Sequence, residues 1–164
     1  MKYFRNDLWS KINSESENER VKAESEWNKN NKAYCEIFET IKVRLSQKFV
    51  KTYLSNYGFH DFQIKNLVLN HKQYGYKKPI SLDIYITDGV DTFKITYKCI
   101  KKFNISYEAC EGWLERTGFD DWGYDEFLPI DEQTLSHEIL FASGSTILIH
   151  FKNGNIFVTK VKSA

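Results

Sequence analysis

The chain is poor in the residues that form linkers, covalent scaffolds and membrane spans. It has two Pro, and its eight Gly lie at positions typical of turns, so no low-complexity linker is present. Its three Cys are odd in number and lack the spacing of metal-binding pairs, which argues against a disulfide framework and a zinc knuckle. Apolar runs span a few residues, far short of the roughly 20 that cross a bilayer. We therefore predict no transmembrane helix, no structural metal and no disulfides.

The first residues also lack the uninterrupted apolar core of a secretory signal peptide. Together with the free Cys, this indicates a reducing, cytoplasmic location. The length of 164 residues is typical of one domain, and 41% hydrophobic and 16% aromatic residues supply a core. We therefore predict a single domain over residues 1–164.

The first third of the sequence, residues 1–56, has the pattern of helices. Ser14 and Glu17 have the spacing of a capping box, which predicts a helix start. Six apolar residues then recur at helical spacing and predict a core-facing stripe: Trp27, Tyr34, Phe38, Ile41, Leu45 and Phe49. The polar tract Asn28–Asn31 has poor helix propensity, so the region forms either one helix or two.

Residues 57–164 are rich in Ile, Val, Thr, Tyr and Phe in short runs, as strands are. The segments 81–87 and 92–97 flank Asp88-Gly89, and the segments 146–152 and 155–161 flank Asn153-Gly154. Both dipeptides favour the positive φ angles of tight hairpins. We predict two hairpins, the second at the C-terminus, with the segment 135–142 pairing beside it.

Helices followed by strands indicate an α+β fold, in which the helical region packs on an antiparallel sheet of five or six strands. One face of this sheet would lie against the helices. The other face, or an open edge, would be left to water, to a partner or to a second copy of the chain in a homodimer.

Charge is unevenly distributed, although the formal net charge is only +1 and does not favour binding to nucleic acid or membranes. Residues 42–102 contain twelve Lys or Arg and four Asp, whereas residues 104–138 contain ten Asp or Glu and one Arg. We predict an acidic, aromatic insertion at residues 104–133. Its carboxylates either form an interface or solvate a loop and pair with the basic part of the same chain.

The interface interpretation assigns partner contacts to seven residues of this insertion: Trp113, Asp120, Asp121, Trp122, Tyr124, Asp125 and Glu126. Aromatic rings supply contact area, and carboxylates speed the encounter with a basic protein. The predicted partner is therefore a basic protein.

The sequence contains no phosphate-binding glycine loop, nucleophile elbow or metal-binding His pair, so we predict no catalytic residues and no cofactor. An enzymatic alternative uses His60, oriented by Asp61, with Cys99 or Cys110 as the nucleophile. We expect His60 and Asp61 not to bond to each other, because adjacent strand residues point to opposite faces.

Several short segments carry a family resemblance: Met1–Phe4 with Leu8-Trp9, the string Phe59–Ile64, the string Trp122–Glu126 and the predicted C-terminal hairpin. The chain resembles a bacterial family of unknown function, chiefly from Gram-positive organisms, although Phe62 stands where many members have Ser. The resemblance implies a cytoplasmic bacterial protein and assigns no catalytic residues. Our leading hypothesis, which the acidic block motivates, is a non-enzymatic binding protein for a basic partner. Small α+β proteins often serve as immunity partners of toxins, so one form of this hypothesis is an immunity protein that neutralises a basic toxin.

Overall fold

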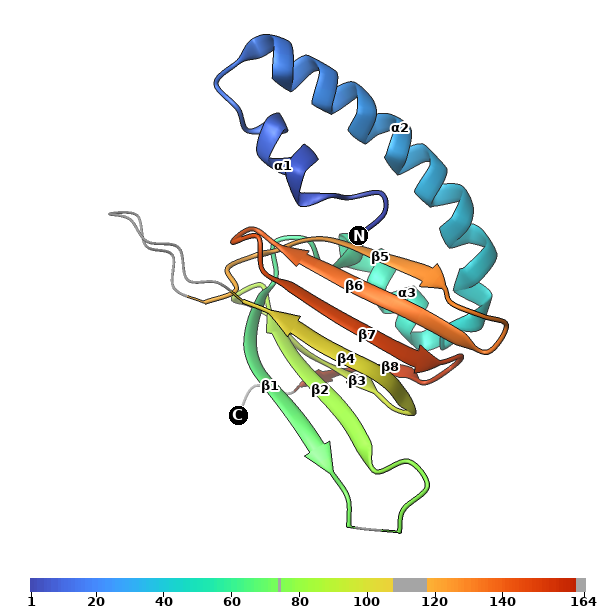
Figure 1. The fold of residues 1–164 in the computed structure, drawn as a ribbon. Helices are drawn as coiled ribbons and strands as arrows, with labels where there is room; N and C mark the ends of the chain where they lie inside the picture. Colours follow the sequence, from blue (N-terminus) through green and yellow to red (C-terminus); the bar gives the residue numbers. More distant parts are fainter. Residues whose placement is uncertain (74, 108–117, 162–164) are drawn as a thin grey trace.

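The computed structural model describes residues 1–73, 75–107 and 118–161 and shows an α+β protein with antiparallel sheets (Figure 1). The helices are α1 (Asn6–Ile12), α2 (Glu17–Ile41), η1 (Lys42–Arg44), α3 (Gln47–Ser55) and η2 (Tyr57–Phe59), where η marks a 3-10 helix. The strands are β1 (Gln63–His71), β2 (Ile80–Thr87), β3 (Thr92–Tyr97), β4 (Ile100–Ser106), β5 (Trp122–Pro129), β6 (Thr134–Phe141), β7 (Thr146–Lys152) and β8 (Ile156–Val161). The predicted α+β class is confirmed.

The eight described strands form two sheets, with the orders β1-β2-β3-β8 and β4-β7-β6-β5. The prediction of a single sheet with five or six strands is therefore wrong. Two of the additional strands, β4 and β5, overlap residues 104–133, which the sequence interpretation treated as an insertion. The many polar and charged residues of β4 and β5 made the alternating pattern of a strand hard to recognise in the sequence. They occur because one face of each strand does not contribute to the apolar core.

The predicted hairpin around Asp88-Gly89 is confirmed, since β2 pairs with β3 from Thr87 and Thr92 onwards. The predicted C-terminal hairpin is wrong, because β7 and β8 lie in different sheets. β8 pairs with β3, whereas β7 pairs with β4 and with β6, which contains most of the segment predicted to lie beside it.

Asn153-Gly154 makes a corner between the two sheets. Gly154 has φ +70, and its N–H donates to the carbonyl of Arg44 at 2.7 Å. The Arg44 guanidinium in turn donates to the side-chain oxygen of Asn153. Positive φ permits a tight hairpin at this dipeptide, but the contacts with Arg44 hold the chain in a bend instead.

α2 is one continuous helix, so the tract Asn28–Asn31 does not interrupt it. The predicted capping box is absent. The N-cap residue is Ser16, whose side chain makes no cap hydrogen bond, and the Ser14 hydroxyl donates to the Glu19 carboxylate at 3.0 Å. Packing of the apolar residues on both sides of the asparagine tract outweighs its poor intrinsic propensity.

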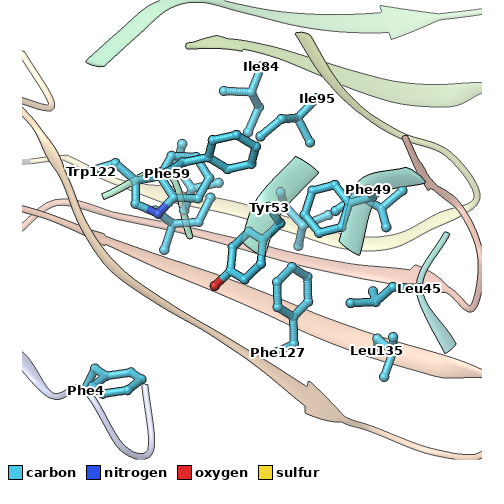
Figure 2. Packing of buried hydrophobic residues seen from close by; sticks show 14 of the residues in the cluster. Phe4, Leu45, Phe49, Tyr53, Phe59, Ile84, Ile95, Trp122, Phe127 and Leu135 are labelled. Carbon is cyan, nitrogen blue, oxygen red and sulfur yellow. The ribbon is translucent and has the colours of Figure 1, made fainter. Parts of the chain in front are cut away.

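All six residues of the predicted apolar stripe are buried. They do not share one helix face, because η1 separates Leu45 and Phe49 from the residues of α2. Figure 2 shows Phe49 and Tyr53 of α3 between Ile84 and Ile95 of one sheet and Phe127 and Leu135 of the other. The short helix α3 thus inserts its aromatic side chains into the core between the sheets.

The starts of β1 and β5 meet on the opposite side of the molecule from the corner at Asn153-Gly154. Gln63 forms an isolated antiparallel bridge with Asp121, and the N–H of Trp122 donates to the carbonyl of Phe62 at 2.7 Å. The N–H of Asp61 donates to the carbonyl of Trp122 at 2.9 Å. These bonds place the His60-Asp61 turn beside the beginning of β5.

Candidate functional site

The structure separates the seven residues that were predicted to contact a partner. Trp122, Asp125 and Glu126 are buried, so the prediction that they form an exposed interface is wrong. Asp120, Asp121 and Tyr124 are half-buried, and Trp113 lies outside the described residues. β5 is the edge strand of its sheet, yet both of its faces are covered, since Asp125 bonds to Tyr53 and His137 on one face and Glu126 binds the N-terminal segment on the other.

Asp125 belongs to a buried chain of hydrogen bonds. Its Oδ1 accepts from the Tyr53 hydroxyl at 2.8 Å, and its Oδ2 lies 2.6 Å from Nε2 of His137. Nδ1 of His137 lies 2.7 Å from the Tyr97 hydroxyl. Assigned from these partners, Nε2 carries the imidazole proton and donates to Asp125, while Tyr97 donates to Nδ1. Four side chains, from α3, β5, β6 and β3, thereby provide hydrogen-bond partners for one another's buried polar groups.

This chain of groups holds its tyrosines in the protonated form. Burial raises the pKa of Tyr53 and of Tyr97 well above the ordinary value, and the negative charge of Asp125 adds to both shifts. Burial and Asp125 also raise the pKa of Tyr34, whose hydroxyl accepts a hydrogen bond from the N–H of Phe127 at 2.8 Å. The interior around Asp125 therefore disfavours a second negative charge.

Glu126 points to the other face of β5 and binds the N-terminal segment. Its carboxylate accepts hydrogen bonds from the backbone N–H of Tyr3, at 2.9 Å, and of Lys2. Glu138 of β6 lies beside it and forms an ion pair with the Met1 amino group at 2.9 Å. These carboxylates hold a chain segment in place, which is a structural role.

A pocket of about 320 Å³ opens beside β5, between α2 and the segment that runs from α3 through η2. Six aromatic residues line it: Phe4, Tyr34, Phe38, Tyr53, Tyr57 and Tyr124. The charged residues of the lining are Glu39 and Asp125, and none of the described residues that line the pocket is Lys or Arg. The pocket is therefore aromatic and acidic, and it reaches the buried Asp125 chain.

The segment 57–61, of which Tyr57, Gly58 and His60 line the pocket, contains strained backbone. Tyr57, Phe59 and Asp61 have φ angles of +51, +61 and +66, which are unusual for residues with side chains. Gly58 lies among them with φ +70, and a Cβ there would approach the Tyr53 hydroxyl to 3.1 Å. Tyr57 is 89% exposed although it is a large aromatic residue. Such strain is concentrated at functional sites in proteins.

His60 lines the pocket, and its Nδ1 approaches Oδ1 of the adjacent Asp61 to 2.9 Å. The expectation that they point apart is wrong, because they lie in a turn that precedes β1 instead of in a strand. The His60 ring packs edge-on against Tyr124, with 5.2 Å between ring centroids. His60 thus forms one wall of the pocket.

The cysteines proposed as nucleophiles are not brought to His60 in the described structure. Cys99 lines a different pocket, of about 720 Å³, at the corner between the sheets, where its Sγ lies 3.0 Å from the side-chain oxygen of Asn155. Cys110 lies outside the described residues. Four Lys and two acidic residues of the described chain line this corner pocket.

Within the described ranges, no three His, Cys, Asp or Glu residues gather as a metal-binding group. Over the same residues, no helix is long and apolar enough to span a membrane. Comparison with protein-family models, curated proteins and solved structures found no match. The functional interpretation therefore depends on the geometry of the pocket.

Sequence reasoning missed His137, the centre of the buried chain. A signal was present, because Leu135, His137, Ile139 and Phe141 alternate along β6, and all four are fully buried. A His within an alternating apolar row is expected on the core side, where it needs hydrogen-bond partners.

Proposed function

We propose that this chain is a non-enzymatic binding protein that recognises a basic partner protein through the aromatic, acidic pocket beside β5. The observation that carries the proposal is the composition of that pocket, in which six aromatic residues accompany Glu39 and Asp125 without a lining Lys or Arg. Aromatic faces and carboxylates both attract cations. Neutralisation of a basic toxin by an immunity protein is one form of this function.

The proposed face differs from the one that the sequence predicted. Tyr124 and Asp125 belong to both, but Asp125 contributes from below the surface. The exposed acidic side chains at the new site are Glu39 on α2 and Asp61 beside η2. These two residues stand 22 positions apart in the sequence, and the fold brings both to the surroundings of Tyr124, whose pKa is raised by burial and by the Asp61 charge.

The test is affinity capture from the native lysate at low and high salt, followed by mass spectrometry. The double variant Glu39→Gln/Asp61→Asn removes the rim charges, and its matched control is Glu15→Gln/Glu132→Gln, which changes two exposed carboxylates outside the pocket lining. We expect a basic protein that the wild type and the control retain at low salt and that the rim variant loses. Equal recovery by all three proteins would contradict the proposal.

A cysteine-dependent enzyme is the second candidate, because Cys35 lines the same pocket as His60, which Asp61 orients. Activation of Cys35 by His60 predicts fast alkylation of this thiol in the wild type and slow alkylation in His60→Ala. Equal alkylation rates in the two proteins would remove this candidate and leave the binding function.

A further inference from the structure

We infer that the pocket beside β5 receives the ammonium group of a lysine side chain from the basic partner. This inference rests on the proposed function and adds the chemical class of the group that is recognised. It draws on the arrangement of the aromatic walls, the buried carboxylate at the base and the exposed tyrosine at the rim.

The walls consist of rings that meet at different angles. The ring centroids of Phe4 and Tyr34 are 5.2 Å apart, with an angle of 80° between the ring planes. The ring centroid of Phe38 lies 6.1 Å from that of Tyr34 and 5.8 Å from that of Tyr53. A ring face attracts a cation that lies within about 6 Å of its centroid. These rings pack against one another and form an aromatic lining, which is the surrounding that we assign to the ammonium group.

Asp125 supplies a negative charge beneath these rings. It is only 6% exposed, and its oxygens lie 2.8 Å from the Tyr53 hydroxyl and 2.6 Å from Nε2 of His137. The carboxyl group is therefore held in place by hydrogen bonds, and none of the described residues that line the pocket is Lys or Arg, although the imidazole of His60 forms one wall. A buried charge of this kind is stabilised when a cation binds beside it.

The same hydrogen bonds favour lysine over arginine. Each oxygen of Asp125 already uses one lone pair, and the residue is only 6% exposed, so little room is left for a planar guanidinium to reach both oxygens at once. An ammonium needs no such planar match, because it acts as a compact point charge at the end of a flexible chain. We therefore expect the pocket to discriminate between the two basic side chains.

Tyr57 supplies the last element, at the rim. Its ring is 89% exposed, it belongs to the pocket lining, and its backbone has φ +51. An exposed aromatic side chain on strained backbone is suited to cover a cation that enters from solvent. Its exposure also makes it the residue best suited to mutation, since its removal leaves the core intact.

The test titrates the purified full chain with Nα-acetyl-lysine N-methylamide, followed by NMR chemical shifts. The arginine analogue controls for positive charge alone, and the norleucine analogue controls for the apolar part of the side chain alone. We expect the lysine probe to bind about tenfold more tightly than either analogue, as one favourable buried charge contact allows. Equal affinity for lysine and norleucine, or tighter binding of arginine, would overturn the inference.

Variants locate the binding. Tyr57→Ser should weaken the lysine probe about three- to fivefold, the effect of losing one exposed cation–π contact. Asp125→Asn should weaken it about tenfold or more. Tyr76→Ser is the matched control, since Tyr76 is 59% exposed, lies in the connection between β1 and β2 and is not part of the pocket lining. Wild-type binding by Tyr57→Ser and by a folded Asp125→Asn would place the probe elsewhere and refute the inference.

The two proposals fail separately. If the lysine probe binds as expected but no basic protein is captured, the lysine pocket stands and the proposed function fails. If a partner is captured in a rim-dependent way but the lysine probe neither binds nor competes, the function stands and the lysine inference fails.

Discussion

The imidazole of His137 lies 2.6 Å from the carboxylate of Asp125 and stacks on the ring of Phe127, with 3.8 Å between ring centroids. His137 pairs directly with Phe127 across β5 and β6, and Asp125 is two residues along the same strand. The strand register therefore fixes both contacts. The hydroxyl of Tyr97, from β3 in the other sheet, lies 2.7 Å from Nδ1 of the same histidine, so the buried chain of hydrogen bonds links the two sheets.

Loss of this pair should destabilise the protein strongly. We expect Asp125→Ala and His137→Ala each to lower the free energy of unfolding by about 3–5 kcal/mol, because each leaves a buried polar partner unsatisfied. The double variant should cost less than the sum of the two, with a coupling of about 1–3 kcal/mol. Urea unfolding of the four proteins measures the coupling, and additive losses would show that the two side chains act independently.

Tyr97 should make stability depend on alkaline pH. Because burial raises its pKa in the folded state, the unfolded chain releases the phenolic proton first. The stabilisation is complete below about pH 10, the ordinary tyrosine pKa, and is lost as pH rises towards the folded-state pKa. Tyr97→Phe should be less stable at neutral pH by about 1–3 kcal/mol, since Nδ1 of His137 loses its partner.

The stability gap between wild type and Tyr97→Phe should then narrow above about pH 10. Denaturant unfolding at several pH values checks this, with the exposed Tyr57→Phe as the control. A gap that stays constant across the alkaline range would mean that Tyr97 is not protected in the folded state.

Gly58→Ala should disturb the pocket from the backbone. The residue has φ +70, and an added Cβ would lie 3.1 Å from the Tyr53 hydroxyl, so strain and a tight contact act together. We expect a loss of about 1–2 kcal/mol and displacement of Tyr53 from Asp125. Gly154→Ala, which has the same φ but open space around its Cβ, separates backbone strain from the contact. Similar losses in both variants would show that the contact with Tyr53 adds nothing.

Glu126→Gln should release the N-terminal segment. The carboxylate accepts two backbone hydrogen bonds there, and an amide supplies one acceptor oxygen instead of two. We expect about 1–3 kcal/mol of destabilisation and faster hydrogen exchange of the Lys2 and Tyr3 amides. Exchange rates equal to those of wild type would show that other contacts hold this segment.

Several features follow from local pattern. The α+β class, the burial of all six stripe residues and the Asp88-Gly89 hairpin depend on spacing and turn chemistry within short windows. Such signals are readable because one helix face or one two-strand pair determines them. The 16% aromatic residues likewise indicated ample material for a core, and many of these rings are buried.

Long-range contacts decided the rest. The corner at Asn153-Gly154 depends on a hydrogen bond from Arg44 to the Asn153 side chain, and these two residues are 109 positions apart in the sequence. No local pattern distinguishes this corner from a hairpin. The acidic run around Asp125 suggested a solvated surface, but the two-sheet packing turned Trp122 and Asp125 inward and gave Asp125 its partners Tyr53 and His137. Whether a carboxylate meets water or a buried donor is set by which elements pack together, and only the tertiary structure specifies that.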